Sequence, residues 1–169
     1  MAQFSCTRKI EIDAAHRVPD HGSKCFNLHG HRYVIEATVV GDVQPEGEQT
    51  GMVMDFGFLK KLMTRVIYDP CDHGTIFYVN DPMLKQCSYK EAKNEGWKIF
   101  TMDYVPTAEN LAFVWGNMLN EAFTLWWEDH GNKNFSAPHL ARLRVYETPN
   151  CWADFPAVVA HEHAGPETI

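Results

Sequence analysis

The chain has 169 residues, 45% of them hydrophobic and 22% charged, with a formal net charge of −7 at pH 7. This length and composition predict one globular domain with its own hydrophobic core. The negative charge argues against a nucleic-acid partner, because phosphate binding needs a basic face. No stretch approaches the roughly 20 apolar residues that a membrane span requires, and the polar N-terminus does not resemble a signal peptide. The five cysteines form no C-x-x-C pair, which favours reduced thiols, so we expect a soluble, cytoplasmic protein.

Two strands are predicted in the N-terminal part of the chain. Residues 4–13 place β-branched and apolar residues at every second position, as in a half-buried strand. Residues 31–42 show a stronger alternation of the same kind. The loop between them contains Pro19 and Gly22, which are typical of turns.

Two helices are predicted in the middle of the chain. The first runs from about Phe56 to Tyr68, with Asp55 as its N-cap and Pro70 ending it. The second follows Pro106 and reaches about Asp129. Its N-cap is Thr107, and its first turn contains Glu109, whose charge suits the helix dipole.

Residues 71–105, between the helices, show no regular pattern and are predicted to be a long connection with an insertion at about 75–105. Connections longer than about 15 residues are often functional or partly disordered. This segment is therefore a place where we expect a specific role.

Residues 140–148 and about 152–160 complete the set as two further strands. The order strand, strand, helix, helix, strand, strand predicts an α+β fold, in which an antiparallel four-stranded sheet carries two helices on one face. We expect a single domain over residues 1–160 and a flexible tail over 161–169. The bare sheet face and open sheet edges favour association with other subunits.

The strongest chemical signal is the tripeptide His29–Gly30–His31 at the start of a strand. Residues i and i+2 of a strand point to the same face, so the two imidazoles lie side by side. His16, at the end of the preceding strand, is the natural third ligand, and three histidines leave the open position of a catalytic zinc site. The alternative is a turn with solvated histidines. We favour Zn²⁺ bound by His16, His29 and His31.

Cys25 lies four residues before His29, in the loop that leads into this site. A nearby metal would lower its pKa and make the thiolate a usable base. Alternatively, Cys25 is a fourth ligand that closes the site, or a buried bystander.

Two further groups, the adjacent pair Asp72 and His73 and the single residue Glu147, are candidates. Asp72 and His73 are adjacent, and such a carboxylate can orient the ring, although an unremarkable loop pair is the commoner case. Glu147 lies near the end of an apolar strand, where it is either an exposed strand end or an acceptor for N–H groups of a ligand.

Six segments resemble, in order and in spacing, the motifs of the 6-pyruvoyl-tetrahydropterin synthase family. They are DAAHR (13–17), KCFNLHGHRY (24–33), GMVMDFGFLKK (51–61), CDHG (71–74), PTAENLA (106–112) and YETP (146–149). The C-x3-HGH spacing most resembles the queuosine-pathway branch, whose product is 6-carboxy-5,6,7,8-tetrahydropterin. The chain departs from the family pattern in CDHG, where LDH is usual, and in the greater length of the segment that follows.

The resemblance implies the tunnel fold, a ββααββ unit whose sheets assemble into a barrel. The usual assembly is a homohexamer, a dimer of trimers, with active sites between subunits. It also implies zinc held by His16, His29 and His31, with 7,8-dihydroneopterin triphosphate as substrate.

The resemblance further assigns roles to matching positions. Cys25 would be the catalytic base, Asp72 and His73 a proton relay, and Glu147 both the anchor of the pterin N–H groups and a member of that relay. Two more residues, Thr107 and Glu109, would line the pterin pocket.

Four alternatives to the carboxy-forming reaction are open from the sequence. A pyruvoyl-forming synthase would keep the side-chain carbons. A folate-forming branch has glutamate just before HGH, where this chain has Leu28, which speaks against it. A zinc cyclohydrolase would use the same open site to activate water. A zinc-stabilised assembly module would have no activity at all.

Overall fold

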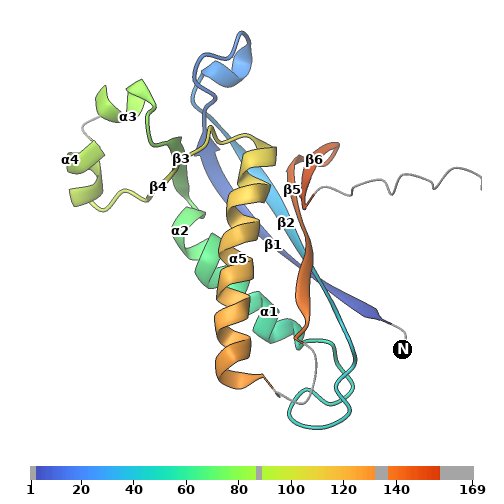
Figure 1. Cartoon of the computed structure of the whole chain (residues 1–169). Helices are drawn as coiled ribbons and strands as arrows, with labels where there is room; N and C mark the ends of the chain where they lie inside the picture. The colour runs from blue at the N-terminus through green and yellow to red at the C-terminus, as the bar shows by residue number, and fades with distance from the viewer. Residues whose placement is uncertain (1–2, 87–88, 132–136, 157–169) are drawn as a thin grey trace, which may run out of the picture.

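The structure, a computed structural model, describes residues 3–86, 89–131 and 137–156. Six strands form one sheet in the order β4-β3-β1-β2-β5-β6 (Figure 1). The strands are β1 (Phe4–His16), β2 (His29–Gly41), β3 (Gly74–Tyr78), β4 (Ile99–Met102), β5 (His139–Thr148) and β6 (Cys151–Phe155). The helical elements are η1 (Lys24–Phe26), α1 (Phe56–Met63), η2 (Thr64–Tyr68), α2 (Asp69–Cys71), α3 (Pro82–Gln86), α4 (Tyr89–Asn94) and α5 (Ala108–His130).

The prediction of a four-stranded antiparallel sheet is wrong in strand number and in direction. β1, β2, β5 and β6 do pair antiparallel in succession. However, β3 pairs parallel with β1, and β4 pairs parallel with β3, which makes the sheet six-stranded and mixed. Both extra strands come from the segment 71–105 that was predicted to be a connection. They are five and four residues long, and neither GTIFY nor IFTM shows the alternation of apolar and polar residues that marks a half-buried strand.

The helices α1 and α5 cover one face of the sheet (Figure 1). Alternate residues of the long strands point to this face and are buried, as the alternation predicts. The largest fully buried side chains of this core include Tyr33, Ile35, Leu59, Met63, Leu111, Trp115 and Leu143. The core therefore lies between the sheet and the two helices, and it fixes which side chains share the helix-covered face.

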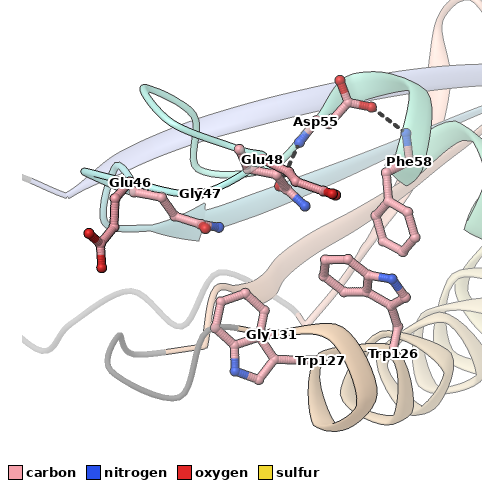
Figure 2. A pocket seen from close by; sticks show the side chains of 10 residues that line it. Glu46, Gly47, Glu48, Asp55, Phe58, Trp126, Trp127 and Gly131 are labelled. Atoms are coloured by element: carbon pink, nitrogen blue, oxygen red, sulfur yellow. Dashed lines mark hydrogen bonds between the residues drawn. The ribbon is translucent and has the colours of Figure 1, made fainter.

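Both predicted helix caps are present. Asp55 accepts a hydrogen bond from the backbone N–H of Phe58 at 2.8 Å, and Thr107 accepts one from Asn110 at 3.4 Å. Figure 2 shows the Asp55 cap, where the ring of Phe58 lies 3.8 Å from that of Trp126. These contacts join the start of α1 to the far end of α5.

Several element ends differ from their predicted positions. β1 continues through His16, and β2 already begins at His29. The first helix does not end at Pro70, because a π-turn with a hydrogen bond from Asp69 N–H to the Thr64 carbonyl carries it on to Cys71. The last strand ends at Phe155, and the predicted stretch 157–160 and tail 161–169 lie outside the described residues.

Within the described ranges, no helix combines the length and the apolar character that crossing a membrane would take.

Candidate functional site

Three histidines converge where the β1–β2 hairpin begins its loop. The strand register sets His16 directly opposite His29, and His31 lies two residues further along β2. The ring centroids of His16 and His29 are 4.6 Å apart, and those of His29 and His31 are 4.9 Å apart. One nitrogen from each ring lies within 4.8 Å of the other two, so the three can hold one metal ion.

Backbone carbonyls orient two of these rings. Nδ1 of His16 donates a hydrogen bond to the Pro106 carbonyl oxygen at 2.6 Å, and Nδ1 of His29 donates to the Asn27 carbonyl oxygen at 2.8 Å. Because a carbonyl only accepts, each Nδ1 carries the proton and each Nε2 offers a lone pair. Sequence reasoning missed both carbonyls, since a backbone acceptor leaves no signature in residue type.

The site fits a metal ion on its own chemistry. Nε2 of His16 is buried and has no hydrogen-bond partner among the described residues, as expected for an atom that a metal would satisfy. Burial lowers the pKa of His16, and also that of His31, which keeps both imidazoles in the neutral form that binds metals. Three imidazoles suit zinc, and also copper, iron and nickel.

Glu147 points toward the three histidines from β5. Its Oε1 atom lies 3.3 Å from Nε2 of His16 and 3.6 Å from Nε2 of His31. The pairing of β5 with β6 shifts register between Tyr146 and Thr148, so Glu147 lies at an irregularity of the ladder.

A cavity of about 210 Å³ brings together Glu147 and three other predicted site residues. Cys25 is half-buried on η1, and Thr107 and Glu109 lie at the start of α5. The complete lining is Val18, His21, Cys25, Thr107, Ala108, Glu109, Glu147, Cys151 and Trp152. Cys151 and Trp152 were not predicted as site residues. The short turn after Thr148, which folds β6 back beside Glu147, is the signal that could have indicated them.

The pair Asp72 and His73 lies elsewhere. Asp72 accepts hydrogen bonds from Nδ1 of His73 at 2.7 Å and from the backbone N–H of Asp13 at 3.0 Å. Burial opposes ionisation of Asp72, but these hydrogen bonds outweigh it and lower the pKa of the carboxyl group. The side chain of His73 is 76% exposed.

A separate hollow contains His73. Its lining includes Asp13, Ala15 and Arg32, which alternate with the buried residues of β1 and β2 and so belong to the other face of the sheet. His31, one of the three converging histidines, also lines this hollow. Neither Cys25 nor Glu147 lines it. Within one chain, the Asp–His pair and the Cys25 cavity are therefore two separate places.

Residues 5–157 match the family model described as 6-pyruvoyl tetrahydropterin synthase. The chain belongs to this family. It is 38% identical over 151 residues to the 6-carboxy-5,6,7,8-tetrahydropterin synthase of Rickettsia conorii, which covers 89% of this chain and 99% of the relative. It is 29% identical over 162 residues to the human 6-pyruvoyl tetrahydrobiopterin synthase, with 88% of each chain covered.

Solved structures of similar fold include a member of the 6-pyruvoyl tetrahydropterin synthase family. The synthase of Caenorhabditis elegans has a TM-score of 0.58 and 25% identity, covering 92% of this chain and 96% of its own. An uncharacterized protein of Wolinella succinogenes reaches a TM-score of 0.69 at 19% identity, covering 91% and 98%. The resemblance found from six motifs is thus confirmed, and the chain is a pterin synthase family enzyme with a three-histidine site.

Proposed function

We propose that this chain is a zinc-dependent 6-carboxy-5,6,7,8-tetrahydropterin synthase of queuosine biosynthesis, acting in the cytoplasm. It converts 7,8-dihydroneopterin triphosphate and water into 6-carboxy-5,6,7,8-tetrahydropterin, acetaldehyde and triphosphate. The observation that carries the proposal is the convergence of three imidazoles beside a cavity that is walled by Cys25 and Glu147. Relatives named for this reaction are 36–38% identical to the chain over most of its length.

His16, His29 and His31 would hold the zinc ion. When bound, zinc supplies Lewis acidity that makes neighbouring substrate hydroxyls more acidic. The protein's own contribution is to orient the imidazoles through the carbonyls of Pro106 and Asn27 and to bury the His16 ring.

Cys25 and Glu147 act on the substrate from the walls of the cavity. The Cys25 thiolate serves as the base that takes a proton from the side chain of the substrate. Glu147 accepts hydrogen bonds from adjacent N–H groups of the pterin, a pairing that suits a carboxylate. Thr107 and Glu109 line the same cavity and shape it around the ring.

The Asp72–His73 pair serves the active site of a neighbouring subunit in this proposal. Asp72 holds Nδ1 of His73, which leaves Nε2 free to move a proton, and the exposed ring faces outward. This arrangement explains why the pair lies apart from Cys25 within one chain.

The proposed assembly is a homohexamer of two trimers, built from tunnel-fold domains that span residues 1–160. Within the described residues, β1 pairs with β3 only over Ala14–His16, so most of this edge has no partner strand in its own chain. An open edge of this length favours pairing with another copy.

The second candidate is pyruvoyl-forming synthesis, which releases triphosphate but keeps the side-chain carbons. The human relative named 6-pyruvoyl tetrahydrobiopterin synthase favours it, at the lower identity of 29%. Incubation of the zinc-loaded protein with 7,8-dihydroneopterin triphosphate, followed by chromatography and mass spectrometry, separates the two. A pyruvoyl product would move the assignment to this candidate, and unchanged substrate would contradict both.

A further inference from the structure

Arg17 joins the unusually long segment after β3 to the turn that contains Cys25. It directly follows the proposed metal ligand His16. Its Nε atom lies 3.3 Å from Oδ2 of Asp81, whose side chain is fully buried, and the side chain of Arg17 is itself only 12% exposed. The other oxygen of Asp81 accepts a hydrogen bond from the backbone N–H of Met83 at 2.8 Å. One buried carboxylate thus accepts a hydrogen bond at the start of α3 and forms an ion pair with Arg17, without a hydrogen bond between Nε and Oδ2.

The guanidinium also contacts the turn that contains Cys25. The Arg17 Cζ atom lies 4.6 Å from the centroid of the Phe26 ring, within range of a cation–π interaction. Phe26 is adjacent to Cys25 in η1, and the backbone N–H of Val18 donates to the Cys25 carbonyl at 2.8 Å. In Figure 1 the blue turn that contains η1 and the helix α3 lie at the same end of the sheet.

Because Asp81 is buried and Arg17 largely so, separating the two side chains is energetically costly. A buried carboxylate without a cation is strongly unfavourable, so Asp81 keeps Arg17 in place rather than merely attracting it. Nη1 of Arg17 also contacts Sδ of Met83 at 3.4 Å. The guanidinium therefore contacts three residues, Asp81, Met83 and Phe26.

We propose that Arg17 and Asp81 are positioning residues, through which the segment 79–86 fixes the turn of Cys25 against the substrate cavity. The proposal rests on the proposed function, in which Cys25 is the base. In this proposal the long segment holds Phe26 in place, and with it the thiol of the adjacent Cys25.

Two variants test the link, with one matched control. Asp81→Asn removes the charge that holds Arg17, and Phe26→Leu removes the ring without touching the buried pair. Asp20→Asn makes the same chemical change at an exposed site in the same loop, where a φ of 62° also suits asparagine. Each zinc-loaded protein is treated with iodoacetamide, and the alkylation rates of Cys25 and Cys151 are compared by peptide mass spectrometry.

Cys151 is an internal reference, because it is exposed and lines the same cavity from β6. We expect the ratio of Cys25 to Cys151 alkylation to change several-fold in Asp81→Asn and in Phe26→Leu. In both, kcat for the pterin substrate falls about tenfold or more, since small misplacements of a reacting group are costly, while KM and zinc content stay unchanged. A third variant, Arg17→Lys, keeps the charge but not the planar face. Its alkylation ratio and kcat should lie between those of Asp81→Asn and those of the parent protein. The control behaves like the parent protein.

Unchanged alkylation ratios and kcat in both variants would overturn the proposal. So would a loss of activity that follows zinc content or thermal stability alone, because the link would then be merely structural. If the parent protein itself does not convert the pterin substrate, the proposed function fails, yet the alkylation ratios still show whether Asp81 and Phe26 position Cys25.

Discussion

The Oε1 atom of Glu147 lies 3.3 Å from Nε2 of His16, and no hydrogen bond joins them. Since Nδ1 of His16 donates to Pro106, the lone pair of Nε2 faces a carboxylate oxygen. Two electron-rich atoms this close favour a bound cation beside them. The proposed pterin anchor and the proposed metal site are therefore neighbours.

The first prediction concerns metal binding. His29→Ala removes one of three ligands, so zinc retained after dialysis against a weak chelator should fall from about one ion per chain to nearly none. His139→Ala, at an exposed histidine at the start of β5, is the control and should keep its zinc. Equal zinc retention in the two variants would show that the three-histidine site does not bind the metal.

The second prediction concerns Glu147. Glu147→Gln keeps the size of the side chain but removes the charge that, in the proposed function, pairs with pterin N–H groups. Loss of charge-assisted hydrogen bonds is worth roughly 1.5–3 kcal/mol, so kcat/KM should fall by about ten- to a hundredfold. Steady-state kinetics would measure this, with Glu121→Gln on the exposed surface of α5 as the matched change. If Glu147→Gln has the kinetics of the parent protein, the charge of Glu147 does not bind the substrate.

The third prediction is a pH dependence of the zinc-free protein. Burial lowers the pKa of His16 and of His31 in the folded state, whereas an unfolded histidine protonates below about pH 6.5. Below that pH the unfolded chain takes up more protons than the folded chain, so the free energy of unfolding should decrease as the pH falls.

Urea denaturation of the zinc-free protein between about pH 7.5 and 5.5 would measure this trend. His16→Gln should weaken the dependence, because one of the two titrating groups is gone. Equal stability at both ends of this pH range would contradict the prediction.

The fourth prediction concerns the backbone next to His73. A methyl group on Gly74 would lie 2.9 Å from the Lys98 carbonyl oxygen and 3.0 Å from that of Cys71. Neither backbone atom can move freely, so Gly74→Ala should destabilise the protein by about 1–3 kcal/mol. Gly22→Ala, where nothing lies within 4 Å, should leave the urea midpoint nearly unchanged. Equal midpoints for the two variants would show that the chain around Gly74 relaxes without cost.

The fifth prediction tests whether active sites are shared between subunits. Cys25→Ala and His73→Ala should each be inactive alone. After unfolding and refolding as an equal mixture, about a quarter of the sites should combine both intact residues and regain activity. A mixture as inactive as its components would contradict an arrangement in which the two residues come from different chains.

The three-histidine site could be predicted from the sequence because it depends on local geometry. The i, i+2 spacing of His29 and His31 fixes their common face, and a hairpin register brings His16 opposite His29. Both helices were likewise predicted from their apolar stripes and from the caps Asp55 and Thr107, although the π-turn that continues the first helix past Pro70 was not.

What escaped prediction depends on pairing between distant segments. β3 pairs in parallel with β1, and β4 pairs in parallel with β3. Such pairing between distant segments leaves no pattern in the short sequence of either strand. The backbone N–H of His73 donates a hydrogen bond to the Asp13 carbonyl oxygen, and Arg17 forms an ion pair with the buried Asp81. Both relationships link residues about 60 positions apart, so only the folded chain shows them.

In the proposed function, the three-histidine site directs cleavage of the pterin side chain. Acetaldehyde released from 7,8-dihydroneopterin triphosphate by the zinc-loaded protein measures this cleavage. We expect about one acetaldehyde for each triphosphate released, formed together with 6-carboxy-5,6,7,8-tetrahydropterin and abolished in His29→Ala. Triphosphate release without acetaldehyde, or acetaldehyde formed equally by His29→Ala, would contradict it.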